Sequence, residues 1–195
     1  MARKLRVLAD MDSIVADFFA GLWRDYEAAT GERVATASIA SWDMSKYVKD
    51  PERLVACFHS PGCFASLDPI PGAIPALQAL VAEGHEVVVV STPCTPHSAA
   101  EKISWCAHHL PFLDQRNVWI GHKKHHVRGD VLIDDGPHNI SAYGLEHPRA
   151  LLVGIAYPYN AHAPYHHRVE GHEDFEAAWA QILDRILTYA LIDDA

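Results

Sequence analysis

The chain has 195 residues, of which 49% are hydrophobic and 21% are charged. This composition is typical of one globular domain with room for a small insertion, and it excludes a disordered chain or a coiled coil. The formal net charge of −9 disfavours binding to DNA or RNA, whose phosphates such a chain repels. A small phosphorylated substrate stays compatible with this charge, because a lysine or a metal ion can reverse the field inside one pocket.

The N-terminal residues and the cysteines indicate the compartment. The apolar stretch near the N-terminus is too short for a signal peptide or a membrane span. The cysteines match no zinc motif and are too few for a disulfide framework, so we expect reduced thiols; they are Cys57, Cys63, Cys94 and Cys106. We therefore expect a soluble, cytoplasmic protein without a membrane or polynucleotide partner, and we leave a homodimer open.

Short apolar runs alternate along the chain with segments of helical periodicity. The runs are typical of buried parallel strands; they are Leu5–Ala9, Glu86–Val90, Asn117–Ile120, Val131–Ile133 and Ala150–Val153. Apolar residues at helical spacing predict helices around Ile74–Val81, around Ile103–Leu110 and from about Asp174 to Leu187. This alternation predicts an α/β fold with a parallel sheet flanked by helices.

Residues 15–67 interrupt the alternation. They begin with an expected helix over 15–29 and continue as a polar stretch with several aromatic residues and no strand pattern. We interpret them as a small helical cap inserted after the first strand, within a single domain whose core comprises about 1–14 and 68–195. The segment 157–168, rich in Pro, His and Tyr, is expected to be an irregular loop.

Asp10 and Asp12 follow the first expected strand directly. Two carboxylates at i and i+2 of an extended segment point to the same side, where repulsion favours a cation between them or a proton on one of them. One carboxylate could attack phosphorus, while the other exchanges protons with the leaving group and with water. A solvated turn is the alternative explanation for this common pattern.

Three further polar groups follow later strands, namely Ser91 with Thr92, Lys124, and Asp134 with Asp135. A hydroxyl beside free N–H groups at a helix start can bind a phosphate oxygen, and a lysine ammonium can pair with one. Adjacent carboxylates after an apolar strand need a counter-charge, and Mg²⁺ prefers such oxygen ligands. Singly, these residues could equally be helix caps or solvated surface groups.

The order of these groups is more informative than any one of them. Ligand sites of open parallel sheets lie beyond the carboxyl ends of the strands, so all four groups are expected at one edge. A pair of aspartates, a hydroxyl, a lysine and a second pair of aspartates at that edge predict phosphoryl transfer assisted by Mg²⁺.

The segments LADMDSIVADF, VVVSTP, VLIDDGP and the region of Lys124 resemble the four motifs of the haloacid dehalogenase superfamily. Together with LDPIPGA, they are most similar to the 5'(3')-deoxyribonucleotidase family, over about Leu5 to Ile155. The resemblance implies a Rossmann-like core with a small helical cap. It also implies a Mg²⁺-dependent phosphomonoesterase that forms an aspartyl phosphate and acts on a nucleoside monophosphate.

The resemblance also implies residue roles. Asp10 would be the nucleophile and Asp12 the general acid and base. The implied Mg²⁺ ligands are Asp10, Asp12 through its backbone carbonyl, and Asp135. The residues implied to bind phosphate are Ser91, Thr92 and Lys124, and those implied to line the substrate pocket are Phe18 and Trp42.

Some positions depart from the family pattern. Ser13 replaces the usual glycine, Gly136 replaces a common arginine, and His122 stands at a basic position. The aromatic cluster around Trp42 is incomplete. Two alternatives therefore stay open: a phosphatase of another small ester, such as a sugar phosphate or a phosphorylated natural-product intermediate, and a non-catalytic protein that binds a phosphorylated ligand.

Overall fold

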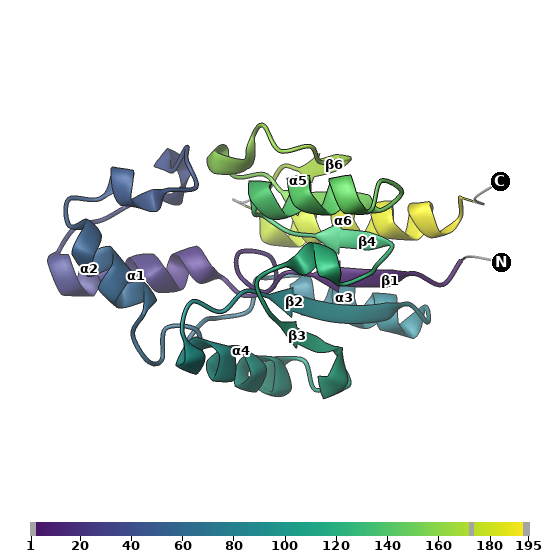
Figure 1. Cartoon of the computed structure of the whole chain (residues 1–195), viewed down its shortest axis with the longest axis horizontal. Helices are drawn as coiled ribbons and strands as arrows, with labels where there is room; N and C mark the ends of the chain where they lie inside the picture. Colours follow the sequence, from purple (N-terminus) through teal and green to yellow (C-terminus); the bar gives the residue numbers. More distant parts are fainter. Residues whose placement is uncertain (1–2, 172–173, 193–195) are drawn as a thin grey trace.

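The computed structural model describes residues 3–171 and 174–192. Within them the strands form one six-stranded sheet in the order β3-β2-β1-β4-β5-β6, with every neighbouring pair parallel (Figure 1). The strands are β1 (Arg6–Ala9), β2 (Glu86–Ser91), β3 (Val118–Ile120), β4 (Val131–Ile133), β5 (Leu151–Ile155) and β6 (His167–Val169). The strand order reverses at β1, which places a ligand crevice at the carboxyl ends of β1 and its neighbours.

Helices cover both faces of the sheet. Side chains alternate along β1, so that Val7 and Ala9 join the larger hydrophobic core while Leu8 joins a smaller one on the opposite face. The larger core includes buried residues of α3, α4 and α6, and the smaller core includes those of α5. These helices are α3 (Ala73–Ala82), α4 (Pro96–His109), α5 (Pro137–Glu146) and α6 (Phe175–Ala190).

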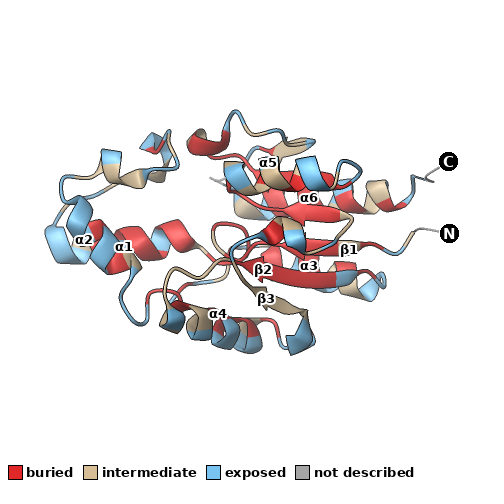
Figure 2. Ribbon diagram, in the orientation of Figure 1, coloured by how far each residue is buried: buried red, intermediate tan, exposed pale blue. Residues whose placement is uncertain are grey.

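Between β1 and α3 the chain forms a helical insertion, displaced to one side of the sheet in Figure 1. Its elements are α1 (Phe18–Thr30), the 3-10 helices η1 (Thr36–Ser38) and η2 (Met44–Tyr47), and α2 (Pro51–Phe58). Its entry and exit segments lie side by side, because Ala16 pairs with Pro69 and the Ile70 N–H donates to the Val15 carbonyl at 2.8 Å. Figure 2 shows that α2 is largely exposed, whereas α1 is buried along much of its length.

Local sequence explains where the insertion and the core helices begin. Asp17 caps α1 by accepting from the Ala20 N–H at 3.1 Å, so this helix begins at Phe18. In α4, Thr95 and Ser98 form a reciprocal capping box around Pro96. Outside the insertion, the described residues also form three 3-10 helices of three residues each: η3 (Gln115–Asn117), η4 (Lys124–His126) and η5 (Pro158–Asn160).

The five predicted strands are present, with bounds that differ by at most two residues. The irregular loop predicted over 157–168 was wrong in part, because it contains η5 and most of β6. This three-residue strand, His-Arg-Val, lies at the sheet edge and carries no apolar run that would mark it. No helix among the described residues has the length and apolarity that crossing a membrane requires.

The helix predicted around Ile103–Leu110 is present as part of α4, but Ile103 does not face the core. Ile103 is 46% exposed. The buried face instead runs through Ser98, Lys102, Trp105 and Cys106. This spacing of i, i+4, i+7 and i+8 is that of a helix stripe facing the core, and it contains a lysine.

Candidate active site

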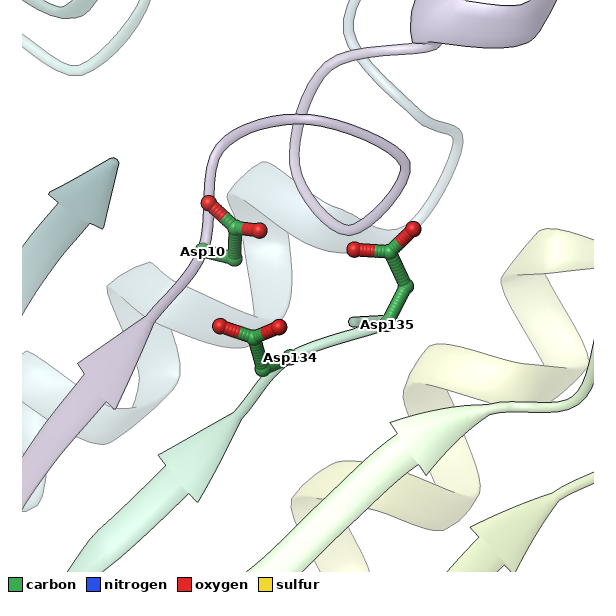
Figure 3. Close-up of side chains that lie close together, drawn as sticks. All are labelled: Asp10, Asp134 and Asp135. Atoms are coloured by element: carbon green, nitrogen blue, oxygen red, sulfur yellow. The ribbon is translucent and has the colours of Figure 1, made fainter. Parts of the chain in front are cut away.

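Three aspartates meet at the carboxyl ends of β1 and β4. Ala9 and Ile133 are register partners in these adjacent parallel strands, so the residues that follow them, Asp10 and Asp134, emerge side by side. Asp135 completes the group, and ligand oxygens of the three side chains lie within 4.8 Å of one another. Figure 3 shows the three carboxylates facing a common space. The structure thus brings together groups that the sequence placed more than 120 residues apart.

Lys124 joins two of these carboxylates. Its ammonium lies 2.7 Å from the carboxylate of Asp10 and 2.7 Å from that of Asp134. Burial alone would lower the pKa of Lys124, but the two carboxylates raise it above its usual value, so the side chain stays cationic. Asp134 also accepts from the Gly136 N–H at 2.8 Å and from Asn139 at 3.0 Å, so protein donors already occupy its carboxylate.

Asp12 points to a different lysine. The fully buried ammonium of Lys102 pairs with the Asp12 carboxylate and donates to the Ser91 hydroxyl at 2.9 Å. It also lies 4.3 Å from the ring centroid of Phe64. Burial raises the pKa of Asp12, and the charge of Lys102 opposes that shift. A carboxyl group whose pKa is raised by burial and lowered by a neighbouring charge is suited to exchanging protons.

The charges of this site favour a divalent cation. Among the described residues, two ammonium groups pair with the four carboxylates of Asp10, Asp12, Asp134 and Asp135, so two negative charges are unbalanced when all four are ionised. Burial, together with the nearby Asp10 and Asp134, raises the pKa of Asp135 well above its usual value. An ion of charge +2 would relieve this repulsion, and an all-oxygen set of donors fits Mg²⁺.

The structure brings together the side chains of two of the three residues predicted to bind the metal ion. Asp10 and Asp135 belong to the acidic cluster, whereas the third member is Asp134 rather than the side chain of Asp12. The resemblance implied the backbone carbonyl of Asp12 as a ligand, and that role stays a prediction.

A cavity of about 430 Å³ opens above the carboxylates. Its polar lining includes predicted catalytic, metal and phosphate-binding residues: Asp10, Asp12, Asp135, Thr92 and Lys124. The predicted pocket residues Phe18 and Trp42 line its aromatic wall, together with Phe19, Phe58 and Tyr159. Ser91 is not among the lining residues of this cavity; it is fully buried and contacts Lys102.

Ser13 adopts an uncommon backbone conformation beside the aspartates. Its φ of 59° lies in the left-handed region, where glycine is favoured, and its side chain lines the cavity. Its carbonyl accepts from the Tyr157 hydroxyl at 3.1 Å. The departure from the family glycine therefore falls on a residue that contacts the space above Asp10.

Sequence reasoning missed several residues of this site, and two of them, Lys102 and Tyr159, contact the carboxylates of Asp12 and Asp135. Lys102 could have been found, since it is a charged residue on the otherwise buried stripe of α4. Tyr159, whose hydroxyl donates to the Asp135 carboxylate at 2.5 Å, carried no such signal because its segment has no recognisable period. Both residues act on an aspartate from a distant part of the chain.

Comparisons with known proteins identify the family of this chain. Residues 3–187 match the family model described as "5' nucleotidase, deoxy (Pyrimidine), cytosolic type C protein". The human "5'(3')-deoxyribonucleotidase, cytosolic type" is 30% identical over 145 residues, which cover 69% of this chain and 72% of that protein. The Bacillus subtilis "5'(3')-deoxyribonucleotidase" is 26% identical over 138 residues, covering 70% of this chain and 79% of that one.

Solved structures confirm the fold class. A crystal structure of a HAD family hydrolase from Deinococcus radiodurans, with bound phosphate and sodium, aligns with a TM-score of 0.58 and 17% identity, covering 93% of this chain and 97% of that chain. The parallel sheet with flanking helices is therefore that of the HAD hydrolases. Because the family model spans nearly the whole chain, this protein belongs to the deoxy (pyrimidine) 5'-nucleotidase family of cytosolic type C, a family of phosphate monoester hydrolases.

Proposed function

We propose that this enzyme hydrolyses the phosphate ester of a deoxyribonucleoside monophosphate with Mg²⁺, through an aspartyl phosphate on Asp10. The observation that carries the proposal is the position of Asp10 at the floor of the cavity, in contact with Lys124 and beside Asp135. The names of the relatives, which are deoxyribonucleotidases, support the choice of substrate class.

In the first step, a carboxylate oxygen of Asp10 attacks phosphorus while the bond from phosphorus to the ester oxygen breaks. The Met11 N–H donates to Asp10 Oδ1 at 2.7 Å and Lys124 contacts Oδ2 at 2.7 Å, so the carboxylate has a fixed orientation. A protonated Asp12 gives its proton to the departing oxygen, which leaves as the nucleoside hydroxyl.

In the second step, water attacks the phosphorus of the aspartyl phosphate and gives a proton to Asp12. The bond between phosphorus and Asp10 breaks, which releases inorganic phosphate and restores the carboxylate. Lys124 lies at the cavity, where its ammonium is placed to bind a phosphoryl oxygen. Thr92 also lines the cavity, but its hydroxyl donates to the Gly121 carbonyl at 3.1 Å. Ser91 is fully buried and acts on the site through Lys102, whose ammonium donates to its hydroxyl.

Asp10 and Asp135 would hold Mg²⁺, with the Asp12 carbonyl as the third protein ligand. When bound, the ion supplies charge neutralisation at the phosphoryl oxygens. The unbalanced negative charge of the acidic cluster supports this assignment.

The aromatic wall supports a nucleoside as the leaving group. Phe18, Phe19 and Phe58 offer apolar ring surfaces, and Trp42 of the insertion faces the same cavity. A base stacks favourably on such rings whatever its identity. A cavity of about 430 Å³ lies within the range of small-molecule sites.

The test is phosphate release from a panel of 5'- and 3'-deoxyribonucleoside monophosphates, ribonucleotides and sugar phosphates, each with Mg²⁺ and with EDTA. We expect hydrolysis of deoxyribonucleotides only with Mg²⁺, and none by Asp10→Asn. The matched control is Asp184→Asn on the exposed side of α6, which should keep the wild-type rate. Near wild-type turnover by Asp10→Asn would contradict the assignment of the nucleophile.

A different small phosphate ester is the second candidate. The cavity carries Ser41, His122 and His138 among its lining residues, which make this part of the wall polar. If a sugar phosphate exceeds every nucleotide in kcat/KM on the same panel, this candidate replaces the first while the chemistry at Asp10 stands.

A further inference from the structure

The segment after β5 returns to the paired aspartates that follow β4. The Tyr159 hydroxyl donates to Asp135 Oδ2 at 2.5 Å, and the Asn160 amide donates to the Asp135 carbonyl at 3.2 Å. The Tyr165 hydroxyl donates to the Asp134 carbonyl at 3.0 Å. Asn160 is fully buried, and its side chain also contacts the Ile155 carbonyl at 2.9 Å. The segment therefore fixes the backbone of both aspartates but touches only one of the carboxylates.

Room for these contacts depends on a glycine in β5. A Cβ atom at Gly154 would lie 2.5 Å from the Tyr165 ring and 2.6 Å from the Asp134 carbonyl oxygen. The close approach of this segment to the aspartates is therefore built into the sheet itself, because only glycine leaves the space open.

The ring of Tyr159 makes a second set of contacts. It stacks on Tyr157 with ring centroids 5.3 Å apart, and it meets the Trp42 ring edge-on at 5.5 Å. It also lies 5.7 Å from Phe19. Trp42 belongs to the insertion, whereas Tyr159 belongs to the core, so this ring contact joins the two across the cavity.

From these contacts we infer that Tyr159 is a positioning residue with two separable actions. Its hydroxyl holds the Asp135 carboxylate in the orientation that receives the divalent cation, and its ring holds Trp42 in the wall of the substrate cavity. The inference rests on the proposed function for the identity of the cation site. It adds a residue, outside the recognised motifs, that contacts both the metal-facing carboxylate and the substrate wall.

The two actions predict different results for two substitutions. Tyr159→Phe removes the hydroxyl and keeps the ring, so the Kd for Mg²⁺ should rise about 10-fold, the usual effect of losing an outer hydrogen bond to a ligand. At saturating Mg²⁺ the KM for substrate should be unchanged. Tyr159→Leu removes both groups, so it should raise the Kd for Mg²⁺ equally and also raise the KM at saturating Mg²⁺.

The direct readout is isothermal titration of the whole protein with MgCl₂ in the absence of substrate. Tyr189→Phe is the matched control, because its hydroxyl donates to the remote Arg149 carbonyl at 2.7 Å; it should bind Mg²⁺ like the wild type. In an Asp135→Asn background, Tyr159→Phe should cause no further loss of affinity. A merely structural hydroxyl would weaken binding in both backgrounds.

The inference is overturned if Tyr159→Phe binds Mg²⁺ with wild-type affinity, or if the wild type binds no Mg²⁺. It is also overturned if the loss of affinity persists unchanged in the Asp135→Asn background. Failure of the proposed function gives a different pattern, in which the wild type binds Mg²⁺ through the Tyr159-dependent site but releases no phosphate from any ester.

Discussion

Lys102 and Asp12 form an ion pair that joins α4 to the loop after β1, and the lysine is fully buried. The same ammonium donates to Ser91 at the end of β2. Asp12 is therefore held by a group from outside the aspartate cluster, and its carboxylate is not part of the cluster formed by Asp10, Asp134 and Asp135. The two carboxylates, although only two residues apart, therefore have different surroundings, which the different roles proposed for them require.

Replacing Lys102 should impair the proton transfer assigned to Asp12. For Lys102→Met we expect kcat to fall about 100-fold, the lower end of what general acid-base catalysis contributes, with a much smaller change in KM. Steady-state kinetics at saturating Mg²⁺ would measure both. Lys123 is exposed and adjacent to Lys124, so Lys123→Met serves as the control and should retain the wild-type kcat. A change in KM alone would show that Lys102 serves substrate binding instead.

Ser13→Gly should stabilise the protein. A left-handed conformation costs a residue with a side chain roughly 1 kcal/mol, and glycine avoids that cost. Since glycine also gains entropy on unfolding, we expect the free energy of unfolding to rise by about 0.5 kcal/mol, measured by urea denaturation. Ser13→Val should be destabilising, because a β-branched residue fits poorly at a φ of 59°. A loss of stability in Ser13→Gly would indicate that the hydroxyl makes a favourable contact.

His85 should make folding stability depend on pH. Its Nδ1 accepts from the Leu5 N–H at 3.1 Å, and burial, with a further contribution from Lys4, lowers its pKa below the ordinary 6.5. Below pH 6.5 the unfolded chain binds this proton more readily than the folded one, so the free energy of unfolding falls as the pH is lowered through the range between the two pKa values.

The measurement is urea unfolding of the wild type and of His85→Gln at several values between pH 5 and 8. Glutamine keeps an acceptor for the Leu5 N–H but does not titrate, so the decrease toward pH 5 should be smaller in the variant. Equal slopes in the two proteins would assign the pH dependence to other histidines.

Cys94 should be the thiol that reacts first with an alkylating reagent. It lines the cavity, whereas burial raises the pKa of Cys63 and of Cys106 to about 12 and suppresses their thiolates. Labelling with iodoacetamide, located by peptide mass spectrometry, should coincide with loss of activity and should be slowed by substrate. In Cys94→Ser, the remaining activity should no longer decline with the reagent. Equal labelling of Cys106 would contradict the buried environment of that residue.

The sequence predicted the sheet and the aspartates well because both depend on local pattern. Val131–Ile133 is a wholly apolar run, and a parallel sheet necessarily carries the residues after such runs to one edge. The proximity of Asp10 to Asp135 followed from that rule and from the resemblance to known motifs. The roles of these residues stay predictions, since they concern reactivity rather than position.

The remaining features depend on contacts that pattern does not reveal. Tyr159 reaches Asp135 from a segment without periodicity, and edge strand β6 is too short to be recognised. Lys102 was overlooked because this helix was predicted from its apolar residues alone, among them Ile103, which is exposed. A charged residue on a buried stripe signals a distant partner but does not identify it, so Asp12 could be named only from the fold.

The paired entry and exit of the insertion have an evolutionary consequence. Val15 is hydrogen bonded to Ile70, and Ala16 pairs with Pro69, so the two ends of the insertion lie side by side where it leaves the core. Its length and sequence can change across generations without lengthening the path between β1 and α3. Changes in this insertion, Trp42 included, can therefore alter the wall of the cavity without moving the acidic cluster of Asp10, Asp134 and Asp135.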